Sequence, residues 1–164
     1  MDWYPWVVVA HVVGAFGFVA AHGVSMFVGF AIRRERDQAR VAAMLDVSSM
    51  SLTGVYLSLL LLLATGIAGG FMGSYWDKAW IWISLATLIV LVVAMYPLGS
   101  GHYAKVRRAV GQKAYNDPKD TPPPDPLPPE QLAPLLASNR PFLLAGLGGG
   151  ALLVIFALME LKPF

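Results

Sequence analysis

An uncharged stretch near the N-terminus most constrains what this chain can fold into. It covers 6–32, reads WVVVAHVVGAFGFVAAHGVSMFVGFAI, and contains no Asp, Glu, Lys or Arg. About 20 apolar residues, each rising about 1.5 Å, are enough for one helix to cross the hydrocarbon core of a bilayer. The stretch therefore predicts a transmembrane helix, and the chain is predicted to be a membrane protein.

The composition supports this prediction and excludes several classes of protein. Of the 164 residues, 57% are hydrophobic, which is more apolar surface than a soluble domain of this size can bury. The lack of cysteine excludes disulfides, c-type haem, iron–sulfur clusters and thiolate metal sites. The charged residues lie between the apolar runs, so the sequence predicts no nucleic-acid partner. The N-terminus lacks the basic region of a signal peptide, so we expect the first helix to be retained.

Three further apolar runs complete the predicted architecture. The sequence predicts an all-α, polytopic membrane protein, a four-transmembrane-helix bundle that forms one domain over 1–164, with helices at about 6–32, 52–72, 79–98 and 141–160. Between the helices, 33–50 is predicted to be a basic loop. The 99–140 segment is predicted to be a basic and proline-rich loop with extended polyproline II structure. It would serve as a semi-rigid spacer or, alternatively, would dock a partner.

The distribution of Lys and Arg predicts the orientation of the helices. The two loops hold ten of the 12 Lys and Arg residues, and the opposite side holds only Lys78 and Lys162. By the positive-inside rule both loops are cytoplasmic and both termini lie outside, an N-out/C-out arrangement. The aromatic residues agree, because amphipathic rings favour the interface and all five tryptophans fall near the predicted outer one: Trp3, Trp6, Trp76, Trp80 and Trp82.

Small residues recur at helical spacing in the predicted spans. The first helix carries a row of them at i+3 or i+4 intervals: Ala10, Gly14, Gly17, Ala21, Ser25 and Gly29. In the fourth helix, Ala145 pairs with Gly149 and Gly146 with Gly150 in the same way. Small residues let helices approach closely in lipid. They indicate tight packing of the bundle or of a homo-oligomer, with a groove for a flat ligand as the alternative.

Two histidines, His11 and His22, are the ionisable groups inside the apolar runs. Eleven residues apart, they point within about 20° of each other and lie about 16 Å apart along the axis. An ionisable group within a membrane is a functional hypothesis by default. A neutral imidazole is a good iron ligand, so we predict b-type haem, with His22 as the first candidate ligand and His11 as the second.

The second axial ligand has several candidates. Met95 is expected at the same depth as His22, Met26 follows His22 by one turn, and His102 reaches that depth only if its helix is shifted inward. A dimer can instead supply one histidine from each protomer. The alternative for His22 is a hydrogen bond to a Ser, Tyr or backbone carbonyl of a neighbouring helix. Binding of a quinone or another polar headgroup is a further alternative, and His102 in its basic segment can contact anionic lipid headgroups.

The remaining residues do not form a recognisable catalytic site. The sequence shows no nucleophile–base constellation, phosphate loop or paired carboxylates, so an enzyme is not predicted. The apolar runs contain no Lys or Arg, and their one carboxylate, Glu160, lies at the outer end of the fourth run. No charged group therefore extends a proton or ion pathway from the histidines, which disfavours transport of protons or cations.

Several motifs together resemble a known group of proteins. The segments HVVGAFGF, HGVSM and RRERD, with the four-helix layout, resemble small bacterial predicted integral membrane proteins of unknown function. Some of these are loosely related to copper resistance protein D and to haem-containing membrane proteins. The resemblance implies a bacterial cytoplasmic (inner) membrane location and a haem-related role. The dense Met/His pattern expected of a copper importer is absent here, which argues against copper transport.

These observations lead to one functional prediction and two alternatives. The predicted function is a membrane protein that binds b-type haem and transfers electrons, in contact with the lipid bilayer and present as a homo-oligomer or in a larger membrane complex. The first alternative is a non-catalytic structural or accessory subunit whose histidines serve packing. The second is a small transporter.

Overall fold

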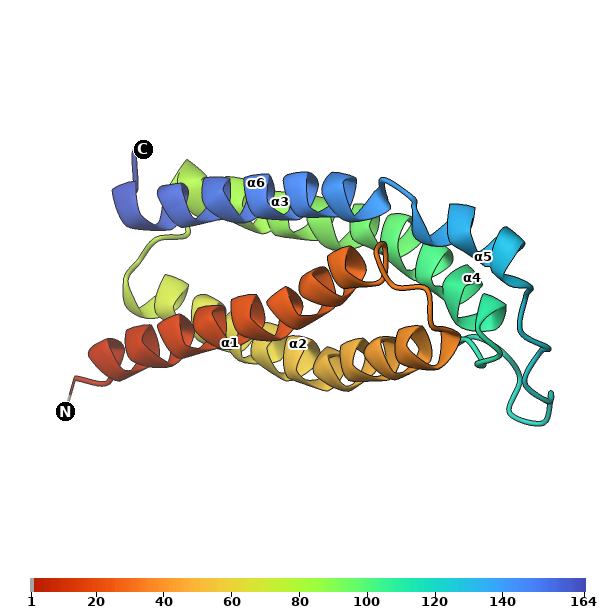
Figure 1. Ribbon diagram of the computed structural model, residues 1–164. Coiled ribbons are helices and arrows are strands. Elements are labelled where there is room, and N and C mark those ends of the chain that lie inside the picture. The colour runs from red at the N-terminus through yellow and green to blue at the C-terminus, as the bar shows by residue number, and fades with distance from the viewer. Residues whose placement is uncertain (1) are drawn as a thin grey trace.

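The computed structural model describes residues 2–164 and is all α. Four long helical segments follow one another, each antiparallel to the one before it (Figure 1). The third of them consists of two α-helices joined by a short π-helical segment, η1. In chain order, the elements are α1 (Tyr4–Ala31), α2 (Gln38–Met72), α3 (Ala79–Met95), η1 (Tyr96–Ser100), α4 (Gly101–Ala109), α5 (Pro129–Leu136) and α6 (Arg140–Leu161).

Four helical stretches are each long and apolar enough to cross a membrane, as the sequence predicts: Tyr4–Ala31, Gln38–Met72, Ala79–Ala109 and Pro129–Leu161. Only 6% to 17% of the residues in their most apolar windows are buried within the chain. Lipid must cover the rest, since exposing so many large apolar side chains to water is unfavourable. By helix length and hydropathy, the chain is therefore a multi-pass membrane protein.

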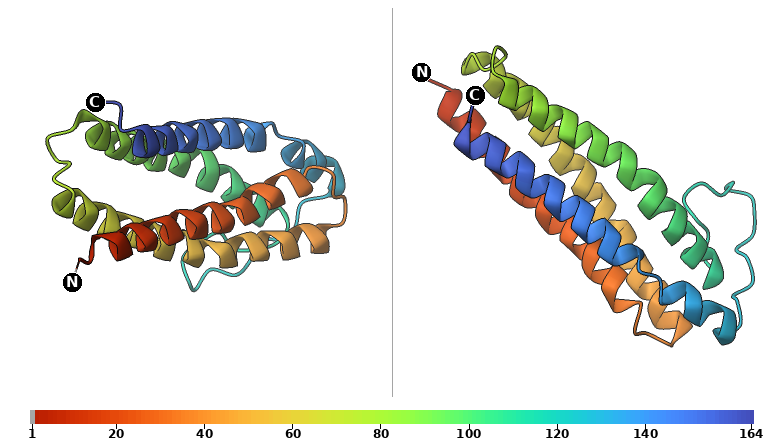
Figure 2. Two further views of the ribbon diagram at one scale, coloured as in Figure 1. Left: turned by 90° about the vertical axis from the view of Figure 1, so that its left-hand side faces the viewer. Right: turned by 90° about the horizontal axis from the view of Figure 1, so that it is seen from above.

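The four segments form two helical pairs. α1 packs along α2, and α3 packs along α6. Figures 1 and 2 show that the two pairs diverge towards the end where both termini lie, which we call the terminal end. At the other end, the basic end, the 110–128 connection and the turn between α1 and α2 lie together. A buried apolar cluster joins the pairs there: Val28, Ile32, Val41, Leu45, Val106, Ala109, Val110, Leu132 and Leu136.

At the basic end, the structure of 33–50 differs from the predicted loop. Helix α2 begins at Gln38, so most of that segment is helical. The Asp37 carboxylate accepts hydrogen bonds from the backbone N–H groups of Ala39 and Arg40, and this caps the helix. Val41 and Leu45, one turn apart, bury one face of the extension in the apolar cluster. Hydropathy alone finds only the lipid-spanning part of such a helix.

The predicted loop over 99–140 is also partly helical. The third segment continues past Met95, through η1 and α4, to Ala109. Pro97 lies inside η1, and because proline cannot donate to the preceding turn, it favours such a local irregularity. Further on, α5 begins at Pro129 within the proline-rich stretch, since proline is well tolerated in a first helical turn. Residues 122–128 have no regular hydrogen-bonded structure.

Aromatic side chains hold the terminal end together. The hydroxyls of Tyr4 and Tyr75 lie 3.0 Å apart, linking the start of α1 to the α2–α3 connection. The ammonium of Lys162, just after α6, lies 4.9 Å from the centre of the Tyr75 ring, a cation–π contact. The rings of Trp76 in this connection and Trp82 on α3 lie 5.3 Å apart, with their planes tilted by 58°. The tryptophans therefore gather at the end where the sequence predicts a membrane interface.

Candidate functional site

His22 lies in the middle of α1 and is partly buried. Its ring stacks on that of Phe18, one turn earlier, with centroids 5.8 Å apart and planes 3° apart. Residues four apart share one face of a helix, so the pair follows directly from the sequence. The Nε2 atom of His22 points towards α6, where it lies 3.9 Å from the position that a Cβ atom on Gly148 would occupy.

Met95, the last residue of α3, reaches the same point from another helix. Its Cε atom lies 3.3 Å from the position of a Cβ on Gly148. The imidazole of His22 and the thioether side chain of Met95 thus converge on one glycine from α1 and α3, as their expected depths in the membrane indicate. We call His22, Met95 and Gly148 the midspan site.

Gly148 is the member of the midspan site that sequence reasoning did not single out. Its neighbours Gly146, Gly149 and Gly150 are indistinguishable from it in the sequence pattern, yet a Cβ on any of them would meet no atom within 4 Å. Only the packing of α6 against α3 and α1 shows which glycine faces the two donors.

The imidazole of His22 has no hydrogen-bond partner within residues 2–164, where His11 is the one histidine with a side-chain hydrogen bond. The alternative prediction for His22 is a hydrogen bond to a neighbouring helix, and no group in this part of the chain makes that bond.

His11 has a different environment. Its Nδ1 lies 3.0 Å from Oγ1 of Thr65 on α2, and that hydroxyl in turn donates to the carbonyl oxygen of Leu61. A Cβ on Gly66 would lie 3.2 Å from Cε1 of His11, so the ring fills the space which that glycine leaves. This arrangement matches the packing interpretation of a membrane histidine.

The other two candidate ligands lie apart from the midspan site or face outwards. His102 belongs to α4, where its ring packs edge-on against Tyr103 at 5.3 Å. The hydroxyl of Tyr103 lies against Gly29 of α1. Gly29 is seven residues from His22, which is about 10 Å along the axis of α1. Met26 follows His22 by one turn on α1, and its side chain is 45% exposed.

The chemistry of the midspan site favours haem over a bare metal ion. Within residues 2–164, no group of three or more His, Cys, Asp or Glu side chains comes close enough to hold a metal. A bare transition-metal ion usually needs at least three protein ligands. Haem brings four nitrogens of its own and needs only one or two axial ligands, of which His and Met are an established pair. His22 and Met95 are donors of these two types.

Charged side chains concentrate at the basic end. Arg107 on α4 makes an ion pair with Asp46 on α2 at 3.1 Å, and Arg108 pairs with Asp117. The Arg108 guanidinium, aided by the backbone N–H of Ala114, holds the pKa of the Asp117 carboxyl below its ordinary value. The first pair joins α4 to α2, and the second fastens the 110–128 connection to α4.

An apolar pocket of about 430 Å³ opens between α3 and α6. Ala94 and Leu147, which directly precede Met95 and Gly148, contribute to its lining. His22, Met95 and Gly148 are not among its lining residues, so the pocket and the midspan site lie on different faces of these helices. The pocket offers only apolar contacts apart from Thr87, which is what a lipid chain requires.

Comparison of the chain with models of protein families, with curated proteins and with solved structures gives no match. No family is identified in this way. What stands of the resemblance drawn from the sequence motifs is the architecture of four long apolar helices, and the chain is accordingly a candidate four-span membrane protein.

Proposed function

We propose that the chain binds b-type haem between α1, α3 and α6, where His22 and Met95 would hold the iron, and takes part in electron transfer within the membrane. One observation carries this proposal. Nε2 of His22 and the end of the Met95 side chain both lie within 4 Å of the position that a Cβ on Gly148 would occupy. Two iron ligands of complementary type therefore face one position from separate helices.

The chain's own residues supply what such a site needs. With its proton on Nδ1, His22 presents the lone pair of Nε2 towards α6, and the stacked Phe18 ring restricts its orientation. Met95 offers a soft thioether, and the surrounding spans keep water away. When bound, haem supplies one-electron chemistry, and the His/Met pair together with low solvent access favours a raised reduction potential.

The setting of this function is also part of the proposal. The basic end would face the cytoplasm and the terminal end the outside of a bacterial cytoplasmic membrane, since Lys and Arg concentrate on the cytoplasmic side. The midspan site then lies within the bilayer, where a membrane-embedded electron donor or a quinone can approach it.

A visible spectrum tests the proposal directly. The protein would be produced with ample haem, purified in detergent and compared with three variants. We expect a Soret band in the wild type that His22→Ala abolishes. Met95→Leu, of similar volume, should retain the band but lower the reduction potential, because one axial ligand is lost. His11→Ala serves as the control and should keep the wild-type spectrum.

Circular dichroism and size-exclusion profiles separate loss of haem from loss of fold. A flat spectrum from folded, haem-supplied wild-type protein would contradict the proposal. It would leave the accessory-subunit interpretation, in which His22 serves packing. Equal loss of the band in His11→Ala and His22→Ala would contradict the assignment of the ligand.

A further inference from the structure

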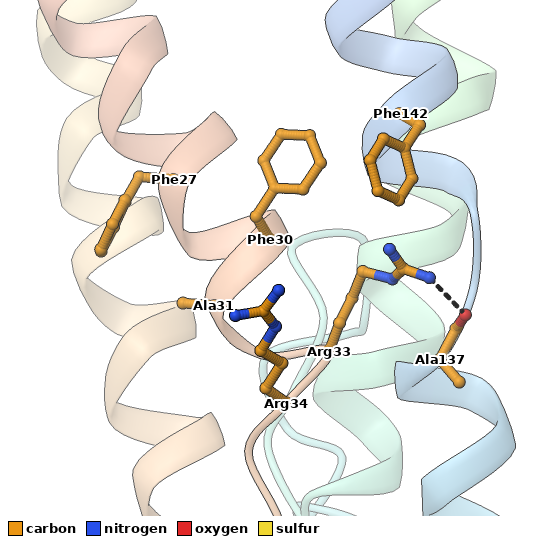
Figure 3. Close-up of a pocket in the computed structure, with 7 residues that line it drawn as sticks. All are labelled: Phe27, Phe30, Ala31, Arg33, Arg34, Ala137 and Phe142. Atoms are coloured by element: carbon orange, nitrogen blue, oxygen red, sulfur yellow. Dashed lines mark hydrogen bonds between the residues drawn. The ribbon is translucent and has the colours of Figure 1, made fainter.

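A second pocket lies at the basic end, where α1 ends and α6 begins. Its volume is about 530 Å³. Figure 3 shows aromatic rings on one side of it and two arginines below them. The rings of Phe30 on α1 and Phe142 on α6 meet edge to face at 5.0 Å, and Phe27 lies one turn before Phe30. The apolar side of the pocket thus belongs to the spans, and its charged side lies where the spans end.

Arg33 is held in place by several contacts. Its Nη2 donates to the carbonyl oxygen of Ala137 and to Oδ1 of Asn139, each at 3.1 Å. The guanidinium carbon lies 4.6 Å from the centre of the Phe142 ring, a cation–π contact. Its Nε–H is buried and has no partner within the described residues. These contacts orient the guanidinium but leave its positive charge without a counter-ion.

Arg34 lies beside it, and its guanidinium lies below Phe30 in Figure 3. Within residues 2–164 neither Arg33 nor Arg34 is paired with a carboxylate; the four ion pairs there involve other basic residues, Arg40, Lys78, Arg107 and Arg108. The neighbouring acids have other partners. Glu35 accepts from the N–H groups of Arg36 and Asp37, which lowers the pKa of its carboxyl.

We propose that this pocket binds an anionic phospholipid, with its phosphate between Arg33 and Arg34 and one acyl chain against Phe27, Phe30 and Phe142. Charge complementarity carries the inference, because two arginines without a counter-ion stand at the mouth of an apolar pocket. Guanidinium groups match the geometry of phosphate oxygens. A soluble phosphate would leave the aromatic side unused, whereas a lipid occupies both sides. The ordered Arg33 reduces the entropic cost of binding.

The order of aromatic and charged groups in the pocket agrees with that of acyl chains and headgroups in a bilayer. The rings belong to the spans, and the arginines follow directly at their ends, so headgroup and chain would lie at the depths they occupy in the surrounding leaflet. This site is separate from the midspan site, and lipid binding does not depend on whether haem binds.

Native mass spectrometry of the full-length protein in detergent, titrated with phosphatidylglycerol or phosphatidylcholine, tests the inference. We expect phosphatidylglycerol to bind more tightly. The double substitution Arg33→Gln/Arg34→Gln should weaken its binding about tenfold, since two charge-assisted contacts are lost. The matched control is Arg36→Gln/Arg40→Gln, which removes the same charge from positions outside the pocket, one in the α1–α2 turn and one in the first turn of α2, and should keep wild-type affinity.

Two results would overturn the inference. If both double variants lose affinity equally, the attraction is a general effect of positive charge and not of this pocket. In a competition experiment, glycerol 3-phosphate and unlabelled phosphatidylglycerol would each be added to protein loaded with isotopically labelled phosphatidylglycerol. If both displace the labelled lipid equally well, the acyl chain contributes nothing and the site is not a lipid site. Thermal unfolding in detergent would verify that each double variant is folded.

Discussion

At the scale of single residues, the proposed haem site depends on Gly148. A Cβ there would lie 3.3 Å from Cε of Met95 and 3.9 Å from Nε2 of His22. The methionine end is flexible and can yield to alanine, but the branched side chain of Gly148→Val would occupy the space between the donors. We expect this variant to lower the Soret absorbance per protein at least about fivefold, measured beside the wild type.

Gly149→Val is the matched control for this substitution. It adds the same side chain to the same helix one position later, where a Cβ would meet no atom within 4 Å. We expect haem content equal to that of the wild type. Equal loss in both variants would indicate a general effect on α6 rather than obstruction of the midspan site.

The sequence is informative about the midspan site only in part. Counting residues from the predicted interfaces places His22 and Met95 at one depth, because rise per residue is constant in a helix. Rotation about the helix axis decides the rest. It directs His11 to Thr65 on α2 and selects Gly148 among its neighbours. Those choices depend on contacts between helices, which a single sequence does not contain.

At the scale of helices, the crossing of α1 and α4 depends on Gly29. The hydroxyl of Tyr103 occupies the space where its side chain would be, with Cβ of Pro141 3.6 Å away. Gly29→Ala would therefore force the tyrosine aside, and we expect a loss of about 1–3 kcal/mol in the free energy of unfolding. Reversible unfolding in mixed detergent micelles would measure it.

Two comparisons make the α1–α4 prediction specific. Gly23→Ala, on the same helix, meets no atom within 4 Å and should leave stability unchanged or slightly raised, because alanine favours helices. In a Tyr103→Phe background, which lacks the hydroxyl, Gly29→Ala should cost less. If Gly29→Ala is as stable as Gly23→Ala, close contact at this crossing is not what holds α1 against α4.

The ends of the helices are harder to predict from the sequence than the spans are. Long apolar runs identify four spans because lipid imposes a minimum length on each. The polar start of α2 and the short α5 are stabilised instead by Val41, Leu45, Leu132 and Leu136, which meet in one buried cluster. In a proline-rich or polar segment, the sequence does not indicate which residues join that cluster, because the cluster depends on tertiary contacts. The predicted loops at 33–50 and 99–140 were too long for this reason.

At the scale of the whole molecule, the two ends have different chemistry. The basic end is joined by an apolar cluster and by ion pairs such as Arg107–Asp46. The terminal end has aromatic contacts around Tyr75 and carries both termini. This asymmetry matches the charge and aromatic bias of membrane proteins with a cytoplasmic basic face. It yields a prediction about topology that needs neither haem nor lipid binding.

The lack of native cysteine allows single cysteines to report on each end. Phe164→Cys lies at the terminal end and Thr121→Cys in the exposed connection at the basic end, and neither changes the number of Lys or Arg residues. A membrane-impermeant maleimide added to intact bacterial spheroplasts should label the first, and should label the second only after permeabilisation. The reverse pattern would place the basic end outside and would contradict the proposed orientation, and with it the cytoplasmic-leaflet position of the Arg33–Arg34 pocket.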